Sequence, residues 1–146
     1  RLIFVANEIT KTLKENNPKI KVALNMGYEI FYKPKNALSW YAHSEELAKS
    51  FDYVAIMAYQ NQMMKELGID LNEAGDLIAA NTDNATNVMG SPDKVLMKLQ
   101  TMNWDNREKL PNREIRYIYQ KIESSSKDVG IAFVPWENRS YKFIRP

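Results

Sequence analysis

The strongest constraint on the fold of this sequence is a fourfold alternation of helix-type and strand-type segments. Apolar residues on steps of three and four predict helices within residues 2–13, 71–78 and 112–122, and acidic residues after Ser44 predict a short helix over 45–48. Between them, apolar runs of strand length predict strands over 20–26, 53–58, 95–99 and 129–134. A chain that alternates in this way forms parallel strands joined by right-handed helical crossovers.

Local signals at the segment ends refine this prediction. Ser44 occupies an N-cap position before the second helix, and Asp70 with Glu73 resembles a capping box at the start of the third. Residues 81–87 are poor helix formers, so we expect the third helix to break there, before Gly90 closes the segment.

Four parallel strands form either a small open sheet or half of an eight-stranded barrel. Each predicted strand is followed by aromatic and polar residues, and not only the strands beside one switch point. A barrel gathers the carboxyl ends of all its strands around one mouth, whereas an open sheet binds at a single crevice. We therefore predict an α/β chain that forms the last four strand-helix units of a (β/α)8 TIM-like barrel, with residues 1–146 as the C-terminal half of that domain.

Composition excludes several function classes. The 20 Lys and Arg against 18 Asp and Glu give a formal charge of +2, too little to capture nucleic acid by charge. The chain has no cysteine and a single histidine, His43, so thiolate nucleophiles and multi-histidine metal sites are excluded. Its five glycines form neither a dinucleotide-binding nor a P-loop motif. The sequence contains no apolar run of membrane-spanning length.

The side chains expected at the mouth suit a carbohydrate. Aromatic faces stack on sugar rings, while amides and carboxylates bind hydroxyl groups. We predict substrate-binding roles for seven residues: Tyr28, Trp40, Asn61, Trp104, Asp105, Trp136 and Glu137. A different hypothesis is that the aromatic rings only cover the core and that the domain is an interaction scaffold that binds no glycan.

Glycan cleavage would require a pair of carboxyl groups. Glycosidases place an acid and a base or nucleophile on either side of the scissile bond. Glu29, Asp105 and Glu137 are the carboxyl candidates expected at the mouth. The sequence does not show which of them, if any, form a pair, so a barrel glycoside hydrolase stays the alternative to a binding domain.

Three segments resemble the PgaB (HmsF) family of poly-β-1,6-N-acetyl-D-glucosamine N-deacetylases. Residues 40–44 (W-Y-A-H-S) with 51–58 (F-D-Y-V-A-I-M-A) resemble the family block W-[FY]-A-Q-S followed by Y-D-[YW]-T-A-[IV]-M-A-M-P-Y-M-E. Residues 94–104 (K-V-L-M-K-L-Q-T-M-N-W) resemble K-V-V-F-E-L-Q-x-x-D-W. Residues 130–135 (G-I-A-F-V-P) resemble the family's G-Y-Y-P-D-D-F ending.

The resemblance implies a C-terminal glycoside-hydrolase-like domain that binds partly deacetylated polymer during biofilm export. The family's metal-dependent deacetylase domain lies upstream, so we expect no metal or cofactor in this segment and no catalysis by the segment alone. The implied partners are the polysaccharide and an outer-membrane export porin, and the implied location is the periplasm or outer membrane. By position, Trp40 and Trp104 match the family's groove tryptophans.

Departures from the family pattern favour binding over cleavage. Residues 59–63 (Y-Q-N-Q-M) lack the family glutamate, Trp136 and Glu137 replace the Asp-Asp pair, and His43 replaces a glutamine. These changes remove or move acidic groups while they keep the stacking surfaces.

Overall fold

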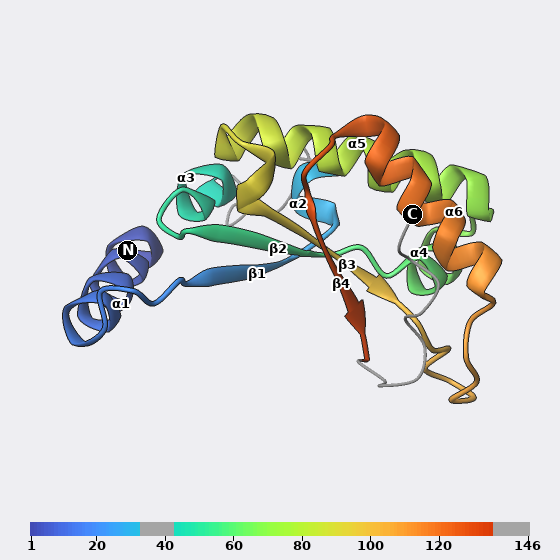
Figure 1. The fold of residues 1–146 in the computed structure, drawn as a ribbon, viewed down its shortest axis with the longest axis horizontal. Coiled ribbons are helices and arrows are strands. Elements are labelled where there is room, and N and C mark those ends of the chain that lie inside the picture. Colours follow the sequence, from blue (N-terminus) through green and yellow to red (C-terminus); the bar gives the residue numbers. More distant parts are fainter. Residues whose placement is uncertain (33–42, 136–146) are drawn as a thin grey trace.

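A computed structural model describes residues 1–32 and 43–135 of the chain (Figure 1). Four parallel strands form one sheet in the order β1-β2-β3-β4. The strands are β1 (Ala23–Gly27), β2 (Tyr53–Met57), β3 (Val95–Gln100) and β4 (Gly130–Val134). The helices are α1 (Leu2–Asn16), α2 (Glu29–Tyr32), α3 (Ser44–Ala48), α4 (Gln60–Leu67), α5 (Leu71–Met89) and α6 (Asn112–Ser125), with a short 3-10 turn, η2 (Pro92–Lys94). The predicted alternation is confirmed.

The core lies between the sheet and the helices on one of its sides. Figure 1 shows α5 and α6 along the upper side of the sheet. Ile56, Met97 and Leu99 of the strands are fully buried there, together with Ile78 of α5 and Ile118 of α6. Burying side chains of this size stabilises the fold by about 1.5–3 kcal/mol each.

The opposite side of the sheet has a different composition. Because side chains alternate along a strand, the residues between the core positions point away from α5 and α6. We call this side the inner face, since in a barrel it would line the interior; it includes Ala23, Asn25, Gly27, Tyr53, Ala55, Met57, Leu96, Lys98, Gly130 and Ala132. Its residues are mostly small or polar, which distinguishes it from the core side.

Helix α5 corrects the predicted break at 81–87. It runs without interruption to Met89, and Gly90 ends it in the left-handed conformation (φ 74°). Thr82 bonds back to the Ile78 carbonyl, and Asn84 donates to the Phe31 carbonyl of α2. Both polar atoms of Asn81 are buried without a hydrogen-bond partner. Packing on the core side therefore overrides weak helix propensity here.

Of the two predicted helix caps, the one at Asp70 is confirmed and the one at Ser44 is wrong. The capping box of α5 is present, because Asp70 accepts from the Glu73 amide and Glu73 accepts from the Asp70 amide. Ser44 is not the cap of α3: it lies inside the first turn and is buried, and His43 occupies the N-cap position without a side-chain cap bond. Helix α4 was not predicted, because its polar opening resembles a loop.

Helix α1 turns its apolar stripe to solvent within the described structure. Leu2, Val5 and Ile9 have the predicted helical spacing, yet they are 63%, 49% and 51% exposed. The Lys14 ammonium joins α1 to Asp52 at 2.8 Å, and the same carboxylate accepts from the Val22 amide at 2.9 Å. These two bonds hold the pKa of Asp52 below its usual value.

None of the helices in the described ranges is long and apolar enough to cross a membrane.

Candidate functional site

The carboxyl ends of the four strands meet at one end of the sheet, because all four are parallel. Barrel enzymes carry their active sites at this end. Strand β1 leads into Tyr28 and α2, β2 leads into Tyr59 and α4, and β3 leads into the loop 101–110. In Figure 1, α4 and this loop lie at the end of the molecule opposite α1.

A pocket of about 140 Å³ lies where β1 and β2 end. Its lining combines two aromatic residues, two carboxylates, an amide and the inner-face end of the strands; these residues are Gly27, Tyr28, Glu29, Met57, Tyr59, Gln62 and Glu66. We call it the β1–β2 pocket. A Cβ at position 27 would meet the end of the Glu29 side chain, so a larger residue there would displace this carboxylate from its place in the pocket.

Glu66 is the best-fixed carboxylate of the β1–β2 pocket. Its Oε2 accepts from the Tyr28 hydroxyl at 3.2 Å, and its Oε1 accepts from the Gln62 amide at 2.5 Å. Gln62 and Glu66 lie one turn apart on α4, so the helix sets their spacing. Each oxygen of an ionised carboxylate accepts more than one bond, which leaves capacity for a ligand.

An aromatic wall stands beside the pocket. The Trp104 and Tyr59 rings meet edge to face, with 4.6 Å between centroids and 73° between planes. Trp104 is 40% exposed, so part of the indole remains available to a ligand. Aromatic pairs of this geometry are stabilised by about 0.5–1.5 kcal/mol beyond their area burial. Asp105, next in the chain, pairs with Lys65 of α4 and ties the loop to that helix.

A tight hairpin presents Trp104. Met102 and Lys109 form an antiparallel bridge, and the Asn103 amide donates to the Glu108 carbonyl at 2.7 Å. Arg107 adopts a positive φ of 61° at the turn. Backbone hydrogen bonds within the loop therefore fix its conformation, and with it the position of the Trp104 backbone.

A buried amide network fixes the start of α4 to the end of β3. Gln60 Nε2 donates to the Gln100 carbonyl at 2.8 Å, and Gln60 Oε1 accepts from the Gln100 amide at 3.1 Å. The Gln100 side chain accepts from the backbone amide of Gln62 and donates to the Met102 carbonyl. Both glutamines are about 1% exposed or less. The network thus positions both the pocket helix and the Trp104 hairpin.

Glu114 of α6 lies behind this network. Its Oε1 is 3.4 Å from Gln60 Nε2, and burial raises the pKa of Glu114 above its usual value. Glu114 does not line the β1–β2 pocket. We therefore interpret Glu114 as part of the structure that supports the site, and not as a ligand-binding group.

The predicted site residues divide into three groups. Tyr28 and Glu29 line the β1–β2 pocket, and Trp104 lies on its aromatic wall. Asp105 is exposed and paired with Lys65, and Asn61 is half-buried on α4; neither lines the pocket. The three remaining predictions, Trp40, Trp136 and Glu137, fall outside the described residues.

Glu66 lines the pocket but was not among the site residues predicted from sequence. No helix is predicted between the strand at 53–58 and the helix at 71–78, so the sequence gives no reason to select position 66. Once Gln60 is known to begin a helix, the i,i+4 spacing from Gln62 places Glu66 at the pocket. Met63 lies on the same helix, at the position where the PgaB pattern quoted above has its glutamate, and it is fully buried in the core.

The chemistry of the pocket suits a sugar that carries a positive group. Two carboxylates attract an ammonium ion, the hydroxyl and amide groups bind sugar hydroxyls, and the rings stack on apolar C–H faces. Among residues 1–32 and 43–135, no three metal-binding side chains are grouped closely enough to hold an ion.

Comparisons with known proteins agree with this architecture. Residues 1–131 match the sequence model of a family described as hypothetical glycosyl hydrolase family 13. The fold is similar to the solved glycoside hydrolase domain of PgaB (BpsB) from Bordetella bronchiseptica, with a TM-score of 0.67 and 18% identity. The likeness covers 92% of this chain and 37% of that one, so the chain spans just over a third of the solved domain's length. A search of curated proteins gives no match. The predicted α/β fold with part of a TIM-like barrel is confirmed, and the resemblance to PgaB is supported.

Proposed function

Because the chain belongs to hypothetical glycosyl hydrolase family 13, we propose that it is part of a barrel domain that binds partially deacetylated poly-β-1,6-N-acetyl-D-glucosamine. The observation that carries the proposal is the β1–β2 pocket, where Glu29 and Glu66 lie beside the Tyr59–Trp104 wall. Deacetylated residues of the polymer carry an ammonium group, which two carboxylates bind through charge-assisted hydrogen bonds.

The proposal extends to the biological setting. Binding of the polymer would serve its modification and export, in a longer protein that also carries a deacetylase domain. We place this protein in the periplasm or at the outer membrane, next to an export porin. The sequence resemblance described above supports this setting.

A Trp104→Ala variant tests the proposal. Titration of the full-length protein with half-deacetylated β-1,6-glucosamine oligomers should give at least fivefold weaker binding for the variant, because the exposed indole loses its stacking contact with a sugar ring (about 1 kcal/mol). The control is Phe4→Ala, which removes an aromatic ring that is 68% exposed on α1. Equal affinity in Trp104→Ala and wild type would remove Trp104 from the site, whereas no binding by either protein would leave the interaction-scaffold hypothesis.

Glycoside hydrolysis is the second candidate, because Glu29 and Glu66 line the same pocket. Retaining and inverting glycosidases both act through paired carboxyl groups. Release of reducing ends from the same oligomers by the full-length protein, lost in both Glu29→Gln and Glu66→Gln, would establish cleavage. Binding without release of reducing ends would leave the domain as a binding module.

A further inference from the structure

An apolar stripe on α1 lies uncovered within the described structure. Leu2, Val5, Ile9 and Leu13 follow one another on steps of three and four, so they share one face of the helix. We call these four residues the α1 stripe. They are between 38% and 63% exposed, and apart from Trp104 every exposed large apolar side chain in the described ranges lies on α1. Contiguous exposed apolar residues of this kind mark an interaction surface.

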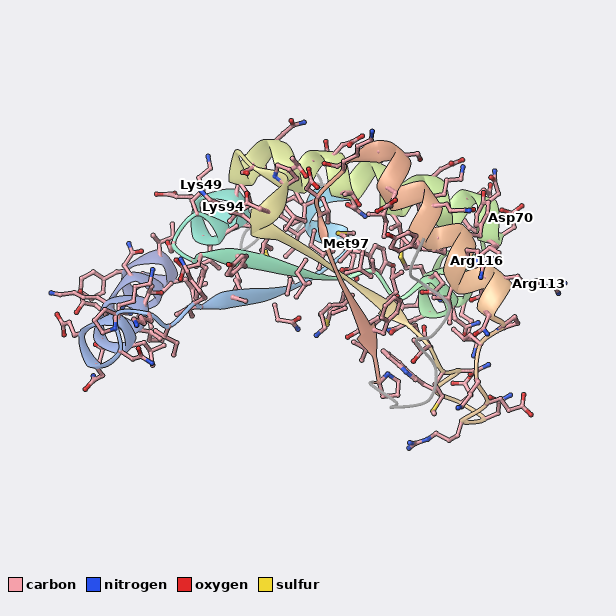
Figure 2. The ribbon with its side chains drawn as sticks, viewed as in Figure 1. Lys49, Asp70, Lys94, Met97, Arg113 and Arg116 are labelled. Carbon is pink, nitrogen blue, oxygen red and sulfur yellow. The ribbon has the colours of Figure 1, made fainter. Side chains whose placement is uncertain are left out.

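Both edges of the sheet also lack a strand partner among the described residues. Strand β1 pairs only with β2, and β4 pairs only with β3. Met97 of the central strand β3, labelled in Figure 2, is fully buried beneath the helices. On the same side of the sheet, Leu24 of β1 and Ile131 of β4 are only half-buried. An unpaired edge presents backbone donors and acceptors to another strand.

The two free edges are complementary to each other. A twofold axis parallel to the strands places β1 of one copy beside β4 of a second copy and keeps all strands parallel. The four strands of each copy then give the eight of a closed (β/α)8 barrel, the architecture of which this fold is a part. The same axis repeats the contact on the opposite side, so that closure leaves no edge unpaired.

Closure of the barrel also covers the α1 stripe. The helices of such a barrel form an outer ring around the strands. Helix α1 directly precedes β1, so in the closed barrel it lies outside β1 and the strand that newly pairs with β1. That strand is the second copy's β4, whose half-buried Ile131 faces outward. An apolar stripe without a charged residue thus meets an apolar side chain.

We infer that two copies of this chain form a twofold dimer, in which β1 and α1 of each copy dock on β4 of the other and complete the barrel. The inference does not rest on glycan binding. It rests on the uncovered α1 stripe, the two free edges and the half-buried side chains of the edge strands.

Sedimentation equilibrium of the 146-residue chain tests the dimer. We expect a particle of twice the chain mass of 17.0 kDa. Ile9→Asp should weaken the dimer about tenfold or more, because it buries an unpaired charge in the interface. Phe4→Asp is the matched control: Phe4 is 68% exposed on the same helix but does not share the spacing of the α1 stripe, so the dimer should be unchanged. Circular dichroism verifies that each variant is folded.

Cross-linking tests which edges meet. The chain has no cysteine, so introduced cysteines are its only thiols. Ala23→Cys and Lys127→Cys place thiols at exposed positions, at the amino ends of β1 and β4. A short flexible dimaleimide should join the two variants when they are mixed and should join neither variant to itself. Cross-linking of either variant to itself would mean that like edges meet, which contradicts the closed barrel.

The mass of the wild-type chain decides between the possible occupants of the α1 stripe. A monomeric 146-residue chain would overturn the dimer, and cosedimentation of that monomer with phosphatidylglycerol vesicles would identify a lipid surface as the occupant. The full-length protein should also be dimeric. A monomeric full-length protein would contradict the inference, because another part of the same polypeptide would then cover the α1 stripe.

Discussion

Replacement of Gln60 with leucine should lower the free energy of unfolding by about 3 kcal/mol, although leucine has a similar volume. The Gln60 amide satisfies both backbone groups of Gln100 in a fully buried place. Leucine would leave a donor and an acceptor buried without partners, at about 1–3 kcal/mol for each group. Glu114 would also lose its contact with Gln60 Nε2.

The same replacement should weaken glycan binding as well as stability. The Gln60–Gln100 pair fixes the start of α4, and α4 carries Gln62 and Glu66 into the β1–β2 pocket. A shift of the helix would move both side chains together. Affinity for the half-deacetylated oligomer should therefore fall even at temperatures where the variant is fully folded.

Urea unfolding followed by circular dichroism measures the stability effect. Gln120→Leu is the matched control, because Gln120 is exposed on α6, and substitutions at such surface positions usually change stability by no more than about 0.5 kcal/mol. A Gln60→Leu variant as stable as the control would show that the network contributes little and that α4 is held by apolar packing alone.

Replacement of Glu66 with glutamine should weaken binding of the half-deacetylated oligomer about tenfold. The change preserves shape and removes one charge, so it converts a charge-assisted hydrogen bond to the sugar ammonium into a neutral one. A loss of about 1.4 kcal/mol corresponds to that factor of ten. Binding should also depend less on salt, since salt screens the removed charge.

Calorimetric titration at two salt concentrations measures both effects. Glu8→Gln on α1 is the control, because Glu8 is an exposed glutamate at the opposite end of the molecule. Unchanged affinity in Glu66→Gln would mean that the pocket does not bind the ammonium group. An equal loss in both variants would indicate a general charge effect, with no specific subsite.

Repetitive features of the fold were predictable from sequence. The period of Ile115, Ile118 and Ile122 identifies the buried face of α6, and the Asp70–Glu73 capping box marks the start of α5. These signals are local, because they depend only on neighbours along the helix. Four strands separated by such helices are sufficient to indicate parallel pairing.

Features that depend on distant contacts were not predictable. A buried Gln60 appears polar in sequence, and only its two bonds to Gln100 explain its place at the start of a helix. Residues 81–87 stay helical because α2, α6 and the sheet pack around α5. Glu66 could not be predicted as a site residue, because its position depends on helix α4, which was not predicted. Tyr28 and Glu29 directly follow a predicted strand, so their place at its carboxyl end could be predicted.

Hydrogen exchange of the full-length protein, with and without a half-deacetylated β-1,6-glucosamine oligomer, tests the central claim most directly. Backbone amides that a ligand covers or orders exchange more slowly. Slower exchange should be confined to segments 27–32, 59–67 and 100–105, which carry the β1–β2 pocket and its aromatic wall, while α1 and α6 stay unchanged. Protection on α1 or α6 instead, or none at saturating oligomer, would contradict the glycan site at the carboxyl ends of the strands.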